Sequence, residues 1–231
     1  MLPYHTVLSI DCANKSLAFT LARVVPRIYI DKQISETYKT LTSICFNNEI
    51  NDEQIEIAAQ SLFKLKNALS QWIVIVKSGV HDLLGGLSVK EVDSVFRTRC
   101  LKDTLNTLNL DLPADTIVII EDQPSIINLL TVAIQAQLQY EFAHYSIIMM
   151  NPKLKNKINL SDEIDYKVFL QKCKSQYEAN KAHSSANFVH MMNTFNLGRM
   201  RLGLQRGNTM LKYDDLADSF MQIIVYTQLK N

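Results

Sequence analysis

The sequence TIVIIE at Thr116–Glu121 is the strongest strand signal in this chain of 231 residues. It is rich in β-branched and apolar residues up to its last position, which predicts a strand buried on both faces of a mixed or parallel sheet. A second buried strand is predicted at Tyr145–Met150, and Ile126–Phe142 between the two has the largely apolar body of a helix. This strand–helix–strand order predicts an α/β fold.

The N-terminal residues predict further strands joined by a tight turn. Val7–Asp11 and Leu17–Val25 are apolar runs, and Asn14 lies between them, where asparagine tolerates turn conformations. A third strand is predicted in either Arg27–Ile34 or Thr40–Phe46. Strands at the start, followed by alternating helices and strands, indicate that the sheet is mixed.

Apolar residues recur at helical spacing after this N-terminal part. A helix is predicted from a cap at Asn51–Glu53 to about Val76 or beyond, and the capping-box pattern Ser88-x-x-Glu91 predicts another that ends near Leu108. Residues 47–112 are therefore expected to be a helical insertion within a single domain over residues 1–231. Three more helices are predicted at Asp162–Asn180, Ser184–Phe195 and Asp214–Leu229.

The composition excludes several classes of protein. Only 6 Gly and 5 Pro, with 47% hydrophobic residues, exclude collagen-like and disordered chains. No apolar run approaches the roughly 20 residues that span a bilayer. The sequence contains no glycine-rich phosphate-binding loop, so no nucleotide cofactor is expected. The 4 Cys have neither zinc nor disulfide spacing and no signal-peptide pattern is seen, so an intracellular, reducing compartment is expected.

The charges are unevenly distributed along the chain. The 24 Lys and Arg nearly balance the 23 Asp and Glu, which argues weakly against nucleic acid as a partner. Residues 151–212, however, hold eleven Lys and Arg but only four Asp and Glu, an excess of seven positive charges. A solvated surface would explain this basic segment about as well as a phosphate-binding one.

Four carboxylates lie at the ends of predicted strands or at the start of the last predicted helix, where folding could bring them together. Asp11 ends the first strand and Glu121 ends the strongest one. Asp215 and Asp218 are three residues apart and share one face of the last helix. Converging acids repel one another unless a cation is bound, and hard oxygen ligands of this kind suit paired Mg²⁺ or Mn²⁺ ions that serve phosphoryl transfer. Taken singly, each acid is more simply explained as a turn former or a helix cap, and only the four together favour a metal site.

Four stretches together resemble motifs of the poxvirus-type Holliday junction resolvases, relatives of bacterial RuvC in the RNase H-like superfamily. They are SIDCANKSLAF at Ser9–Phe19, IIEDQP at Ile119–Pro124, SSANFVHMMNTF at Ser184–Phe195 and LKYDDLADSF at Leu211–Phe220. The last of these is the most specific. Cys12-Ala13 departs from the small or glycine-containing pair usual there, and the resemblance does not extend over Lys32–Asp115.

The resemblance implies a fold, an activity and a set of site residues. It implies an RNase H-like five-stranded mixed sheet flanked by helices, a symmetric homodimer, and Mg²⁺-dependent paired nicks across a four-way DNA junction. Each site would hold two Mg²⁺ ions, for which Mn²⁺ is expected to substitute. The ligands carried over by position are Asp11, Glu121, Asp215 and Asp218. A catalytic lysine is also implied: Lys155 aligns best, and Lys181 is the alternative.

Basic side chains of the C-terminal third are expected to contact DNA phosphates, with strong salt dependence. They are Lys153, Lys157, Lys174, Lys181, Arg199, Arg201, Arg206 and Lys212. Selectivity for a junction would come mostly from its shape, and a two-fold dimer suits a junction with two equivalent strands to cut. The resemblance alone suggests a viral protein that acts where viral DNA replicates in the infected cell.

Two other functions stay open. The same metal site could cut an RNA–DNA hybrid or other branched DNA. Alternatively, the chain could be a non-catalytic adaptor that binds nucleic acid or protein through its extra helical segment, although acids at all four motif positions count against this reading.

Overall fold

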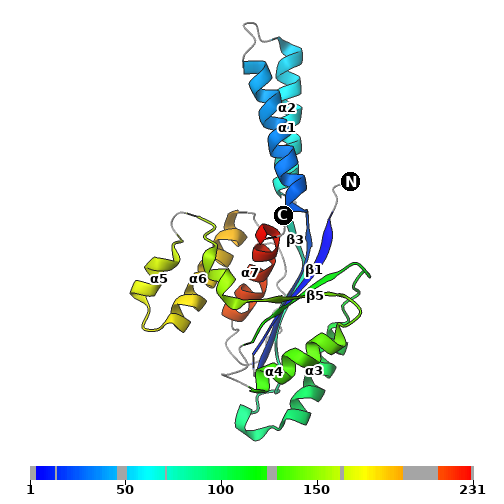
Figure 1. Cartoon of the computed structure of the whole chain (residues 1–231), viewed down its shortest axis with the longest axis vertical. Coiled ribbons are helices and arrows are strands. Elements are labelled where there is room, and N and C mark those ends of the chain that lie inside the picture. The colour runs from blue at the N-terminus through cyan, green and yellow to red at the C-terminus, as the bar shows by residue number, and fades with distance from the viewer. Residues whose placement is uncertain are drawn as a thin grey trace.

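The computed structural model describes residues 4–13, 15–45, 51–70, 72–123, 129–161, 164–194 and 213–229. Figure 1 shows a twisted sheet with helices on both faces and a long helical hairpin that projects from one end. None of the helices in these residues is both long and apolar enough to cross a membrane.

The sheet has five strands in the order β3-β2-β1-β4-β5. They are His5–Cys12 (β1), Ser16–Val24 (β2), Ile73–Asp82 (β3), Ile117–Glu121 (β4) and Ser146–Met150 (β5). Strands β1, β2 and β3 pair antiparallel, whereas β4 is parallel to β1 and β5 is parallel to β4. The predicted α/β class and the RNase H-like five-stranded mixed sheet flanked by helices are confirmed.

The two faces of the sheet are covered by different helices. These are α3 (Ser94–Leu108), α4 (Leu129–Glu141), α5 (Tyr166–Lys172), α6 (Gln176–Thr194) and α7 (Tyr213–Leu229). Side chains of a strand alternate between the faces, so Val7 of β1 packs with α6 and α7, while its neighbour Leu8 packs with α3 and α4. All residues from Asp215 to Thr227 are buried, because α7 lies between the sheet and α6.

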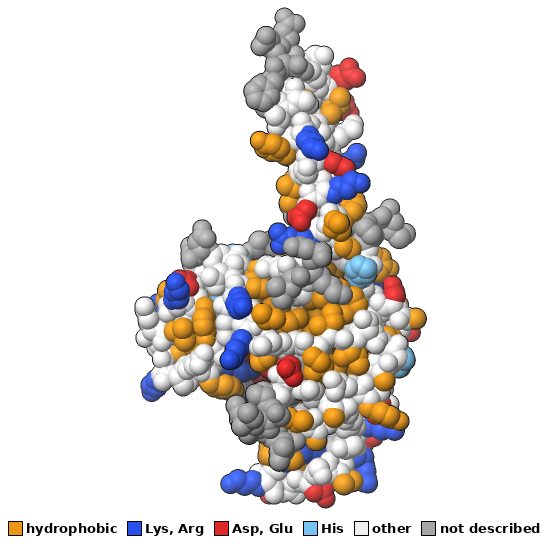
Figure 2. All heavy atoms as spheres, in the orientation of Figure 1, with side chains coloured by type: hydrophobic (Ala, Val, Ile, Leu, Met, Phe, Trp, Pro, Cys, Tyr) orange, Lys and Arg blue, Asp and Glu red, His pale blue; other side chains and the backbone are white. Residues whose placement is uncertain are grey.

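A helical hairpin leaves the sheet between β2 and β3. It consists of α1 (Arg27–Cys45) and α2 (Asp52–Ser70). Its two ends meet, because the amide of Val25 donates a hydrogen bond of 2.9 Å to the carbonyl of Trp72. The hairpin is therefore an insertion into the connection between adjacent antiparallel strands. Its exposed apolar side chains, which Figure 2 shows among charged ones, include Ile28, Tyr38, Ile55 and Phe63.

The predictions for the segment around the hairpin are partly wrong. Neither Arg27–Ile34 nor residues 40–45 form a strand, since both lie in α1, and the helix expected to reach Val76 ends at Ser70. The third strand is β3, where buried Ile73 and Ile75 alternate with exposed side chains as in a strand. A short apolar run such as IVIV fits the helix and the strand period equally well by itself. The predicted helical insertion over residues 47–112 thus includes a strand of the sheet.

Two helix boundaries also differ from the predictions. The capping box of Ser88 and Glu91 is present, but it caps a single 3-10 turn, and α3 begins only after a second cap at Asp93. The break expected at residues 180–183 lies at residues 173–175 instead. There the hydroxyl of Ser175 accepts a hydrogen bond of 3.2 Å from the amide of Glu178 and so caps the start of α6.

Candidate active site

Asp11 and Glu121 lie side by side at one edge of the sheet. Ile10 of β1 pairs with Ile120 of the parallel strand β4, so the two acids that follow them lie at the same level, Asp11 one residue before the end of β1 and Glu121 at the end of β4. Asp11 is two residues after Ser9 and shares its face of β1, which is the face that α7 covers. Parallel pairing therefore brings together two carboxylates that lie far apart along the chain.

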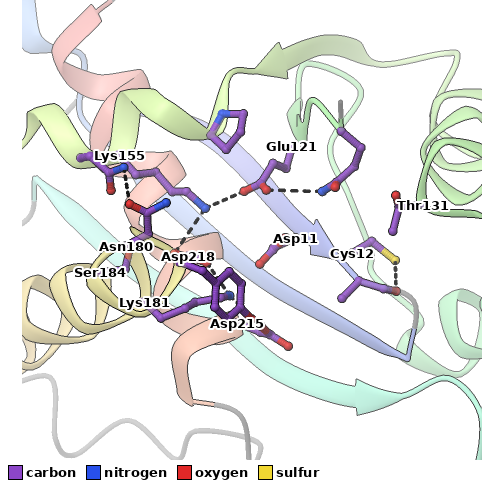
Figure 3. A pocket seen from close by; sticks show the side chains of 15 residues that line it. Asp11, Cys12, Glu121, Thr131, Lys155, Asn180, Lys181, Ser184, Asp215 and Asp218 are labelled. Carbon is purple, nitrogen blue, oxygen red and sulfur yellow. Dashed lines mark hydrogen bonds and ion pairs between the residues drawn. The ribbon is translucent and has the colours of Figure 1, made fainter. Parts of the chain in front are cut away.

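Helix α7 supplies two further carboxylates to the same place. Asp215 and Asp218 lie in its first turns and are only 4% and 6% exposed. The hydroxyl of Ser16 on β2 donates a hydrogen bond of 2.7 Å to Oδ2 of Asp215. All four predicted acids line one pocket of about 300 Å³, and Figure 3 shows them gathered around it. The predicted convergence of the acids is confirmed.

Two lysine ammonium groups lie among these carboxylates (Figure 3). Nζ of Lys155 is 2.5 Å from Oε2 of Glu121 and 3.3 Å from Oδ1 of Asp218. Nζ of Lys181 is 2.9 Å from Oδ1 of Asp215 and 2.7 Å from Oδ2 of Asp218. Lys155 follows β5 in the chain and Lys181 lies on α6. Both candidates for the catalytic lysine therefore reach the pocket.

Burial and neighbouring charges act differently on these groups. Burial raises the pKa of Asp11 well above its ordinary value, and the Glu121 carboxylate raises it further. Burial acts in the same direction on Asp218, but the ammonium groups of Lys155 and Lys181 outweigh it and hold the pKa of Asp218 below its ordinary value. Burial disfavours the charged form of both lysines, yet the carboxylates raise the pKa of each lysine above its ordinary value. Both amines are therefore protonated at neutral pH.

The chemistry of the donor set suits a hard divalent cation. Four carboxylates face two ammonium groups, which leaves an excess of negative charge. Among the described residues, none donates a hydrogen bond to the Asp11 carboxylate. As the side chains stand, no three Asp, Glu, His or Cys residues in the described part of the chain are placed to hold a metal ion. A divalent ion would have to replace some of the lysine contacts, with the oxygen ligands that Mg²⁺ and Mn²⁺ prefer already gathered around it.

The basic residues predicted to bind DNA fall into three groups. Lys181 pairs with the acids of the pocket. Three others are exposed, and two of these lie in the same 3-10 turn as Lys155: they are Lys153, Lys157 and Lys174. Four lie outside the described residues: Arg199, Arg201, Arg206 and Lys212.

Residues that the sequence had not predicted also contribute to the site; two of them are Gln222, which contacts Glu121 from behind the pocket, and Tyr177, which lines the pocket. Nε2 of Gln222 donates a hydrogen bond of 3.1 Å to Oε2 of Glu121. Tyr177 lines the pocket from α6 although it is 67% exposed. Gln222 is four residues after Asp218, so a helical projection of α7 places it on the face of the acids. Nothing in the local sequence singles out Tyr177.

Comparisons with known proteins give one structural likeness. No family model and no curated protein matches the chain. Among solved structures, the chain is similar to the fowlpox virus resolvase, which was crystallised in complex with its substrate, Holliday junction DNA. The two are 14% identical, with 96% of this chain and 97% of that chain covered and a TM-score of 0.48. The function of this chain is therefore inferred from its own pocket.

Proposed function

We propose that this chain is a Mg²⁺-dependent endonuclease that resolves four-way DNA junctions by paired symmetric nicks. The observation that carries the proposal is the convergence of four acids, from β1, β4 and α7, on one pocket with two protonated lysines. Carboxylates gathered in this way bind the metal ions of phosphoryl-transfer enzymes. The sequence motifs that resemble those of the resolvases point to the same reaction.

The proposal gives each charged group of the pocket a role. The four acids would hold two Mg²⁺ ions, for which Mn²⁺ would substitute, and the chemistry such ions would supply is activation of a water and stabilisation of charge on the leaving 3′ oxygen. Lys155 and Lys181 direct positive charge and N–H donors toward the substrate phosphate. In the ion-free pocket the carboxylates raise the pKa of both amines, which keeps both lysines in the cationic form that this role needs.

The substrate and assembly are also part of the proposal. The exposed Lys153, Lys157 and Lys174 neutralise DNA phosphates, and the shape of the junction rather than its sequence provides selectivity. A homodimer supplies one pocket for each of the two equivalent strands. The resemblance to the poxvirus-type enzymes suggests viral DNA replication in the infected cell as the setting.

The test compares three substrates in Mg²⁺: a four-way junction, a linear duplex of the same sequence and an RNA–DNA hybrid. We expect paired nicks in the junction, no cutting in EDTA, and cutting by Asp215→Asn that is at least about 100-fold slower, since loss of a metal ligand costs more than loss of a supporting contact. Asp31→Asn, an exposed acid of the hairpin, should cut as the wild type does.

Other outcomes would change the substrate, the activity or the ligand set of this proposal. Preference for the hybrid would replace the junction by an RNase H-type substrate. Binding of the junction without cutting any substrate would favour the non-catalytic adaptor. Unchanged cutting by Asp215→Asn would show that this residue is not a metal ligand.

A further inference from the structure

Gln222 links the last helix to two strands directly beneath the acids. Its side chain is 0% exposed and lies one turn after Asp218. Its Oε1 accepts a hydrogen bond of 2.8 Å from Oγ of Ser9 on β1, and its Nε2 donates one of 3.1 Å to Oε2 of Glu121 at the end of β4. A single buried amide thus connects α7, β1 and a carboxylate of the pocket.

The surroundings fix the orientation of this amide. An ionised carboxylate only accepts hydrogen bonds, so the NH₂ end of Gln222 faces Glu121. The carbonyl end then faces Ser9, whose hydroxyl donates to it. A buried polar atom without a partner is costly, so rotation of the amide is strongly disfavoured. Glu121 therefore meets a donor whose direction is set by the core of the protein.

The contact from Gln222 falls on one particular oxygen of Glu121. Oε2 accepts hydrogen bonds from Nε2 of Gln222 at 3.1 Å and from Nζ of Lys155 at 2.5 Å. Within the described residues, Oε1 accepts a single hydrogen bond, of 3.3 Å, from the side-chain amide of Gln123. We infer that Gln222 is a positioning residue that holds the Glu121 carboxylate in the orientation in which it binds a divalent cation. This inference rests on the proposed function and assigns to it a residue outside the ligand set.

A second buried hydrogen bond at the same interface offers a matched control. Oγ1 of Thr20 on β2 and Oγ of Ser219 on α7 are 2.8 Å apart, and the two residues are 1% and 0% exposed. Thr20→Val removes this bond between the sheet and α7 without changing any contact of Glu121. Gln222→Met nearly keeps the length of the side chain and removes two buried hydrogen bonds, one from Ser9 and one that ends on Glu121.

The experiment titrates Mn²⁺ alone into the full chain by isothermal calorimetry, with thermal unfolding of each variant measured alongside. We expect Gln222→Met to bind Mn²⁺ about 10-fold or more weakly than the wild type, as for other supporting contacts of metal ligands. Thr20→Val should lower the melting temperature but keep the Mn²⁺ affinity. In a Glu121→Ala background, Gln222→Met should have no further effect on Mn²⁺ affinity, because the amide acts through Glu121.

The possible contrary results separate this inference from the proposed function. Mn²⁺ affinity that is unchanged in folded Gln222→Met, or equally reduced in Thr20→Val, would overturn the positioning role and leave the proposed function standing. If Gln222→Met does not fold, Ser9→Ala removes the donor behind the amide and should also weaken Mn²⁺ binding; unchanged affinity there overturns the role. A wild-type chain that neither binds Mn²⁺ nor cuts a junction overturns both.

Discussion

Lys155 and Glu121 form an ion pair across the end of the sheet, with Nζ 2.5 Å from Oε2 and side chains that are 6% and 14% exposed. Glu121 ends β4 and Lys155 follows β5, so the pair joins neighbouring parallel strands beside the end of β1. The same ammonium group lies 3.3 Å from Asp218 on α7. Without the Lys155 ammonium group, the largely buried carboxylates of Glu121 and Asp218 would repel each other with one fewer positive charge between them.

Lys155→Met should therefore destabilise the protein in EDTA by about 3 kcal/mol or more, because it leaves uncompensated charge in a buried site. Excess Mg²⁺ should restore much of this loss by supplying positive charge to the same acids. Lys181→Met should cost less, since the Lys181 side chain is 20% exposed. Thermal unfolding in EDTA and in Mg²⁺ measures both effects, and equal melting temperatures for Lys155→Met and the wild type would contradict the role given to this pair.

Asp11→Asn should stabilise the ion-free protein at neutral pH and abolish Mn²⁺-dependent cutting. Burial raises the pKa of Asp11 in the folded state, so the folded protein binds this proton more tightly than the unfolded chain does. Ionisation of Asp11 then lowers stability as the pH rises above the ordinary pKa of an aspartate, and this cost is absent at lower pH. The gain in melting temperature in EDTA should be clear near about pH 7 and lost near about pH 3.

The control for this pH dependence is Asp31→Asn on the hairpin, whose carboxylate is exposed. It should change the melting temperature little at either pH. A gain in Asp11→Asn that is the same at both pH values would show that it comes from packing and not from removal of a buried charge.

Replacing residues 27–70 by a short Gly-Ser turn should leave the sheet and the pocket folded. The hydrogen bond of 2.9 Å from Val25 to Trp72 already joins the two ends of the hairpin, so a tight turn can close the gap. The melting temperature should fall, because Ile30 of the hairpin packs against Val25. Mn²⁺ affinity should be retained.

The shortened chain also tests what the hairpin does. Loss of Mn²⁺ binding in a folded variant would contradict the view that the hairpin stands outside the site. Retained Mn²⁺ binding with loss of junction binding would show that the hairpin contacts DNA.

Substitution of Lys153, Lys157 and Lys174 by glutamine should weaken junction binding and reduce its salt dependence. Each lost phosphate contact should lower the slope of log K against log salt concentration by about 0.9. Lys32→Gln on the hairpin, where the lysine side chain is 68% exposed, should leave the slope unchanged. Fluorescence anisotropy in EDTA over a series of salt concentrations provides the measurement, and an unchanged slope in the triple variant would remove these lysines from the DNA interface.

Local sequence patterns were enough to locate most of the elements that carry the acids. The apolar run that ends in Glu121 is β4, and the helix predicted at Asp214–Leu229 is found at Tyr213–Leu229. The third strand was missed because IVIV at residues 73–76 is too short for its periodicity to separate strand from helix. This segment forms a strand because it pairs with β2, and that pairing joins residues too far apart in the sequence for a local pattern to reveal it.

The sequence by itself determined where long apolar runs form strands and helices, and which acids stand at their ends, because periodicity is a property of neighbouring residues. Only the tertiary structure decided which side chains meet. Ser9 and Gln222 are separated by 213 positions and are hydrogen-bonded, and lysines from two different elements both reach the acids. Such contacts depend on strand order, register and the packing of α7 on the sheet, which arise only when the whole chain folds.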